Sequence, residues 1–150
     1  MIVLLPLGCT PGGPSPASQQ MEQSFQATIE IPVEPKVHLL TEKNRYRRDE
    51  YIGIKVENQT RNVLWFTDQD LGLRVYQYDE QSKTWRSVDL GSKLGNPEVT
   101  SIEPGPPDPL PTSVIPVAGI QASGDLRLVI TGITDERQLF VAYKDIEIID

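Results

Sequence analysis

Proline and glycine interrupt this chain so often that long helices cannot be its main element. Together they occupy 24 of the 150 positions, 13 as proline and 11 as glycine. Proline lacks a backbone donor and breaks helix interiors, and both residues mark turns and loops. Seven prolines fall between Asn96 and Pro116, so we expect that segment to be loop or sheet edge rather than central strand. The breakers favour short strands joined by turns.

Between these breakers, apolar and polar residues alternate with the period of two that is typical of half-buried strands. In residues 51–58, Ile52, Ile54 and Val56 share one face, and Lys55 and Glu57 point to the other. No segment shows a clear helical period, so we expect no helix. Further strands are expected at residues 63–66, 71–78, 84–88, 125–132 and 139–143.

This pattern predicts an all-β fold. Roughly seven to eight short strands, with turn signals about every ten residues, are typical of an antiparallel two-sheet sandwich of the immunoglobulin-like type. Because the aromatic residues begin at Phe25, we place the sandwich at residues 24–150. A domain of that size buries about two thirds of its unfolded surface and can fold without disulfides.

The N-terminal segment has a different composition. Residues 1–9 form an apolar run that ends in Gly8-Cys9, and residues 10–23 are rich in proline, glycine, serine and glutamine, a composition that favours a disordered tether. This arrangement resembles the end of a bacterial lipoprotein signal, and we expect residues 1–9 to be part of a longer signal peptide. The resemblance implies that Cys9 is lipidated and that the protein is anchored to a membrane of the cell envelope, outside the cytoplasm. The alternative is a disordered tail in which Cys9 is a free thiol.

A second resemblance covers residues 50–105. The run from Ile54 to Thr60, then Trp65-Phe66, Val75-Tyr76, Trp85 and Glu103-Pro-Gly105, resembles the immunoglobulin-like accessory domains of bacterial envelope lipoproteins. The same run is similar to the bacterial intracellular proteinase inhibitor family. The first resemblance implies a non-catalytic binding domain. The second implies an inhibitor, for which the proline-rich loop from Gly105 to Pro116 is the candidate contact.

The amino-acid composition excludes several classes of functional site. A single cysteine excludes an intramolecular disulfide and a cysteine-rich zinc site, and a single histidine, His38, excludes multi-histidine metal centres. The net charge of −7 argues against nucleic acid as a partner. We expect no enzyme activity, cofactor or metal. Asp68 and Asp70 give only a partial match to a calcium loop, and capping of their own turn is the simpler explanation.

Two groups of side chains are candidates for binding an envelope protein or a cell-surface glycan. Tyr76 and Tyr78 share one side of a predicted strand and, with Trp85 from the paired strand, predict an exposed aromatic platform; the alternative is that the three side chains are buried. Basic side chains form the second group, which we expect either to meet an anionic partner or to remain a solvated loop. Its members are Arg45, Arg47 and Arg48.

Overall fold

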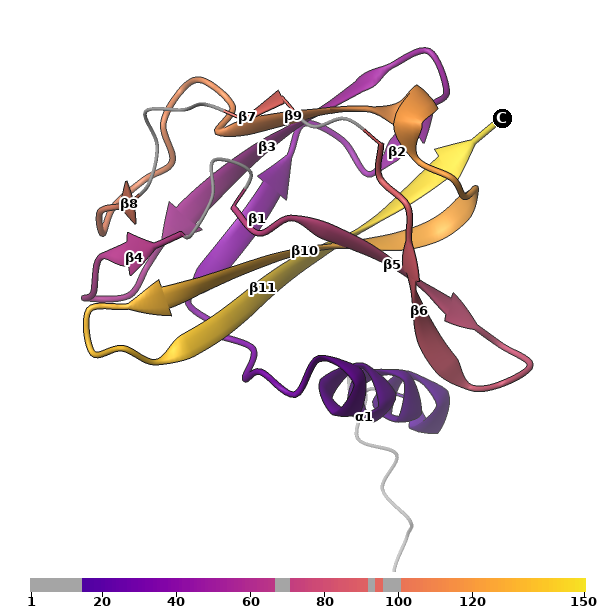
Figure 1. Cartoon of the computed structure of the whole chain (residues 1–150), viewed down its shortest axis with the longest axis horizontal. Coiled ribbons are helices and arrows are strands. Elements are labelled where there is room, and N and C mark those ends of the chain that lie inside the picture. Colours follow the sequence, from indigo (N-terminus) through magenta and orange to yellow (C-terminus); the bar gives the residue numbers. More distant parts are fainter. Residues whose placement is uncertain (1–14, 67–70, 92–93, 96–100) are drawn as a thin grey trace, which may run out of the picture.

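Two β-sheets pack face to face, and one helix lies against the outside of the larger sheet (Figure 1). The computed structural model describes residues 15–66, 71–91, 94–95 and 101–150. Its elements are α1 (Pro16–Ile29), β1 (Val37–Thr41), β2 (Arg45–Arg47), β3 (Tyr51–Asn58), β4 (Leu64–Trp65), β5 (Arg74–Asp79), β6 (Thr84–Val88), β7 (Leu94–Gly95), β8 (Ser101–Ile102), β9 (Ser113–Pro116), the 3-10 turn Val117–Gly119, β10 (Gly124–Thr134) and β11 (Leu139–Ile149).

The smaller sheet has the strand order β1-β3-β9-β7, and all of its pairs are antiparallel. Strand β3 runs through its middle, and the predicted face of Ile52, Ile54 and Val56 is fully buried. Strand β9 lies inside the proline-rich segment, where we expected loop or sheet edge, yet it pairs with β3 on one side and with β7 on the other, so that expectation was wrong for residues 113–116. It is four residues long, and Pro116 is its last residue.

Strand β10 is the axis of the larger sheet. It pairs with β11 along its length, from Gly124 opposite Ile148 to Ile133 opposite Leu139. Its other edge is shared, because β5 pairs with residues 127–129 and β4 pairs with residues 133–134. Strand β6 extends the sheet from β5, β8 extends it from β4, and β2 pairs with β11 in the parallel direction.

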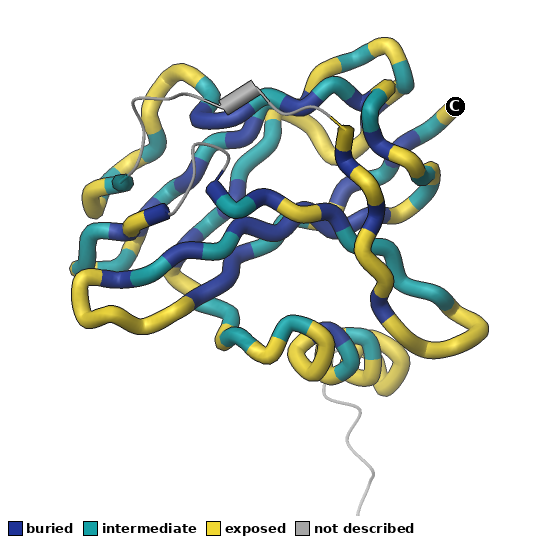
Figure 2. The backbone as a smooth tube through the Cα atoms, viewed as in Figure 1, coloured by how far each residue is buried: buried dark blue, intermediate teal, exposed yellow. Residues whose placement is uncertain are grey.

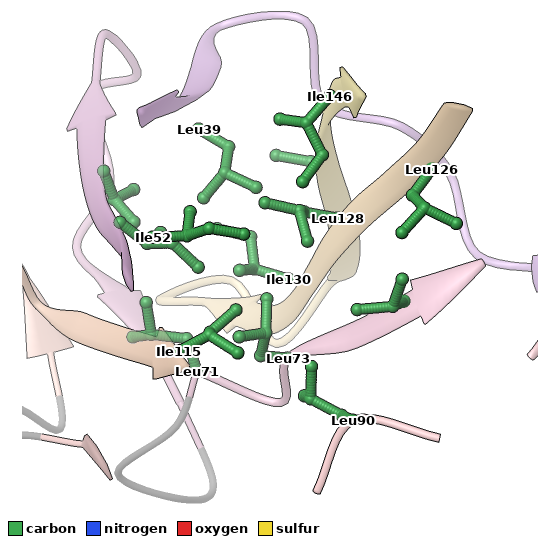
Figure 3. Packing of buried hydrophobic residues seen from close by; sticks show 14 of the residues in the cluster. Leu39, Ile52, Leu71, Leu73, Leu90, Ile115, Leu126, Leu128, Ile130 and Ile146 are labelled. Carbon is green, nitrogen blue, oxygen red and sulfur yellow. The ribbon is translucent and has the colours of Figure 1, made fainter. Parts of the chain in front are cut away.

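The main core fills the space between the two sheets (Figure 3). Leu126, Leu128 and Ile130 of β10 face it, as the alternation predicts, and meet side chains of β3 and β9. The opposite face of β10 is also buried at Arg127 and Val129. Figure 2 shows the reason, since α1 lies below that part of the sheet. The sheet is therefore covered on both faces along the middle of β10.

The structure confirms the predicted fold class, an all-β two-sheet sandwich, and corrects some of its detail. The described residues form eleven strands rather than seven or eight, and the additional ones include β2, β7 and β8, which are only two or three residues long. Such short strands leave too few positions for alternation to be recognised. The pair β2–β11 is parallel, although the prediction was antiparallel throughout.

The expectation of no helix was wrong. Residues 16–23, which we predicted to be part of a disordered tether, form the first half of α1. Ser15 caps the helix by accepting a hydrogen bond from the Ser18 backbone N–H at 3.2 Å, and Pro16 occupies the first turn. Phe25 is fully buried, so the helix is stabilised by packing as well as by its cap.

Gly132 provides a test of the close packing around β10. A β-carbon at Gly132 would lie 2.7 Å from the Phe140 ring and 2.8 Å from the Trp65 carbonyl oxygen, whereas one at Gly53 would lie 3.1 Å from Pro111. We expect Gly132→Ala to lower the free energy of unfolding by about 1–3 kcal/mol because backbone must move. Urea denaturation should show a much smaller change for the control Gly53→Ala. Equal changes would contradict the packing argument.

Candidate functional site

The predicted aromatic side chains do come together, but under a cover. Tyr76, Tyr78 and Trp85 lie on the same face of β5 and β6, where Tyr78 and Trp85 are direct register partners. Trp85 is only 8% exposed, and both tyrosines are partly buried. The expectation of an exposed platform was wrong, because α1 lies on this face and Phe25 packs into it.

Phe25 is the centre of this aromatic cluster. Its ring centroid lies 5.4 Å from Trp85, 5.3 Å from Tyr143 and 6.1 Å from Tyr76, each in an edge-to-face arrangement. The Trp85 indole N–H donates to the Met21 carbonyl oxygen at 3.0 Å. Helix and sheet are therefore joined by ring packing and a hydrogen bond that satisfies the buried indole.

Arg127 lies in the same cluster, and its side chain is 3% exposed. Its guanidinium carbon is 3.8 Å from the Tyr143 ring centroid, 4.5 Å from Trp85 and 4.7 Å from Phe25. Asp145 accepts two hydrogen bonds from it, from Nε at 2.7 Å and from Nη2 at 3.0 Å. The helix supplies a second carboxylate. Glu22 accepts from Nη2 at 2.7 Å and from Nη1 at 3.2 Å, and also accepts from the Tyr143 hydroxyl at 2.9 Å.

These contacts shift the titration of the cluster. Burial acts to lower the pKa of Arg127, but hydrogen bonds and charge from Asp145 and Glu22 outweigh it, so that pKa rises. Burial acts to raise the pKa of Glu22, but the Arg127 guanidinium and the Tyr143 hydroxyl bring it below its ordinary value. Burial is the main cause of the raised pKa of Tyr143. Arg127 and Glu22 therefore favour their charged forms, because each stabilises the charge of the other.

A pocket of about 680 Å³ opens beside the cluster. We call it the hairpin pocket, because it lies between the β5–β6 hairpin, Met21 of α1 and the ends of β10 and β11 where Gly124 and Ile149 lie. Trp85 and Asp145 belong both to the aromatic cluster and to the pocket lining. Such a volume is typical of small-ligand sites.

The predicted basic group is divided by the structure. Arg45 is exposed and pairs with Glu147 of the adjacent strand at 3.4 Å. Arg47 is exposed as well, on the same side of β2, because buried Tyr46 lies between them. Arg48 is instead a structural residue. It pairs with Asp150 at 2.9 Å and donates to three backbone carbonyl oxygens, of Val117, Ile120 and Ala122.

The proline-rich loop projects from the end of the sandwich opposite the hairpin pocket (Figure 1). The Gly105 N–H donates to the Asn58 carbonyl oxygen at 2.9 Å, and the Thr112 N–H donates to the Ile54 carbonyl oxygen at 2.7 Å. Between these two anchors Leu110 is 75% exposed. The loop is therefore fixed at both ends and presents an apolar side chain to solvent.

Other predicted features have a simpler outcome. Cys9, Asp68 and Asp70 lie outside the described residues. His38 shares a hydrogen bond of 3.2 Å with Gln59 at the surface. In the described part of the chain, no three acidic, histidine or cysteine side chains gather closely enough to hold a metal ion. No described helix is both long and apolar enough to span a membrane.

Comparison with known proteins identifies no family for this chain. No protein-family model and no curated protein sequence matches the chain.

Sequence reasoning missed Arg127, Glu22 and Phe25. Arg127 looked like an ordinary outward-facing charge in an alternating strand, and its helix partner Glu22 is 105 residues away. One signal for the helix was present, since Met21, Phe25 and Ile29 recur every four residues after a Ser-Pro start.

The Phe25 side chain determines whether α1 stays on the sheet. We expect Phe25→Ala to lower the free energy of unfolding by about 3 kcal/mol, because it empties a buried aromatic site. Limited proteolysis should then cut within residues 16–30 while the sandwich stays folded. Gln23→Ala, an exposed position of the same helix, should change stability by less than about 0.5 kcal/mol. Protection of the helix in Phe25→Ala would contradict this role.

Proposed function

We propose that the protein is a membrane-tethered, non-catalytic binding domain of the bacterial cell envelope, anchored by lipid on Cys9 and contacting a protein or glycan partner. The observation that carries the proposal is the junction of three segments. An apolar run ends at Gly8-Cys9, a proline- and glycine-rich stretch follows, and a folded domain starts with the Ser15 helix cap. An acyl-modified cysteine followed by a spacer and a domain is the order that a surface-anchored module requires.

The hairpin pocket supports the binding part of this proposal. It combines aromatic and acidic side chains with a volume of about 680 Å³. Ligand sites are usually concave and join aromatic side chains with polar groups, and here polar and charged residues make up more than half of the lining. Met21 of α1 is among its lining residues.

Lipidation of Cys9 can be measured directly. The natural gene with its full upstream reading frame should be expressed in a bacterial host, beside a Cys9→Ala control. We expect the wild-type protein to enter the detergent phase and to carry the mass of two or three acyl chains, because one chain alone binds membranes only marginally. Cys9→Ala should remain in the aqueous phase. A wild-type protein with an unmodified Cys9 would refute the tether.

A second candidate function, proteinase inhibition, is favoured by the loop between β8 and β9. Its anchors at Gly105 and Thr112 and its prolines restrict the chain before any contact is made, which reduces the ordering entropy lost on binding. Leu110 is the side chain it offers to a protease subsite, since it is 75% exposed.

A panel of proteases tests this second candidate. If the chain is an inhibitor, Leu110→Asp should weaken inhibition by about tenfold or more, since a central apolar contact carries much of such an interface. Leu139→Asp is the matched control, because Leu139 is also exposed but lies at the β10–β11 hairpin. Absence of inhibition across the panel, or equal losses in both variants, would refute this function.

A further inference from the structure

The hairpin pocket exists because β5 leaves β10 early. Strand β5 pairs with β10 only at Arg74–Tyr76 and then continues to Asp79 with β6 as its partner. Strand β10 begins three residues before that pairing, at Gly124. Figure 1 shows the β5–β6 hairpin diverging from the β10–β11 pair. The pocket lies between these two pairs of strands, because both of them contribute lining residues.

Aromatic and acidic side chains face this space together. Tyr78 and Trp85 line it from the hairpin, with ring centroids 5.3 Å apart. Carboxylates line it from both sides, Glu80 and Asp125 among them. Both of these are exposed, and the described residues give neither side chain a hydrogen bond or an ion pair. Aromatic faces and free carboxylates are the two groups that attract an organic cation.

The protein already binds one of its own cations in this way, immediately next to the pocket. The Arg127 guanidinium lies over Trp85 and donates hydrogen bonds to the carboxylates of Asp145 and Glu22. Trp85 and Asp145 are also pocket residues. Two carboxylates more than neutralise the single charge of Arg127. Lys144, also in the lining, could balance that excess charge of −1, so the negative charge of the pocket comes from Glu80 and Asp125, which pair with no cation among the described residues.

We propose that the hairpin pocket binds a lysine or arginine side chain on a basic segment of a protein partner. This inference rests on the proposed binding function and names the partner's chemistry. The carboxylates are spread around the pocket, and no three of the described ones could share a metal ion. Their spread fits cations carried along a peptide. The net charge of −7 also attracts a basic partner over distance.

The test uses the full chain with Cys9→Ala, so that no lipid contributes, and an acetylated hexalysine peptide as the probe. Calorimetric titration at low salt should show binding to this chain. The double variant Glu80→Gln with Asp125→Asn should bind about tenfold more weakly, since each exposed ion pair contributes up to about fivefold. Neither side chain has a structural partner, so thermal unfolding should not change.

The matched control is Glu103→Gln with Asp108→Asn. It removes the same two charges from exposed positions in the β8–β9 loop, far from the hairpin. We expect this control to bind hexalysine within about twofold of the parent, because the charges that it removes are distant from the pocket. Its net charge equals that of the test variant, so a difference between the two variants reports the position of the charges. Tyr78→Leu should weaken binding by about threefold, because it removes a cation–π wall.

Three results would overturn the proposal. The first is no binding of hexalysine to the parent chain. The second is an equal loss in the test and control variants, which would show attraction to net charge alone. The third is binding of a chitin hexasaccharide in place of hexalysine, which would make the pocket a glycan site. Because the chain carries Cys9→Ala, none of these results depends on the anchor, and a failed lipidation test would leave the pocket result standing.

Discussion

The buried charge of Arg127 needs hydrogen-bond partners, and the elements on the outer face of the larger sheet have to supply them. A guanidinium that is 3% exposed loses nearly all of its water, and such a loss costs several kcal/mol unless its donors are paired. Asp145 pairs with it from the neighbouring strand, and Glu22 pairs with it from α1. The helix therefore does two things at once. It completes the partners of a buried ion, and it keeps water away from the aromatic rings around Phe25.

Strands β4 and β5 both pair with the same edge of β10, and this explains why one end of the sheet is closely packed and the other is open. Strands β4 and β5 lie one after the other along that edge, so neither runs the full length of β10. At one end the backbone of Trp65 approaches Gly132 so closely that no side chain fits. At the other end the β5–β6 hairpin parts from β10 and leaves the hairpin pocket. Close packing and an open site therefore follow from a single pairing pattern.

Alternation predicted the inward faces of β3 and β10 because those residues contact the opposite sheet directly, and hydrophobicity is what such contact requires. It could not predict what covers the outer face. In the sequence, Arg127 and Tyr76 look like solvent-facing residues, and only the docking of a distant helix buries Arg127 and partly covers Tyr76. That helix was hidden by its own composition. Its serines and glutamines resemble a linker, and its apolar stripe of Met21, Phe25 and Ile29 is one residue wide. The separation of Arg48 from Arg45 likewise depends on backbone carbonyl groups near Ile120, which no local pattern reveals.

The start of α1 also limits how far the sandwich could stand from a bilayer. With a lipid on Cys9 and the helix docked, six residues, Thr10 to Ser15, join the anchor to the domain. Six extended residues span about 20 Å at most, whereas release of α1 would leave the twenty residues from Thr10 to Ile29 as the connection, with a span of about 70 Å at most. Release of α1 would therefore more than double the height at which the hairpin pocket could meet a partner. The contact of Phe25 with the sheet would then determine the maximum distance between the anchor and the sandwich.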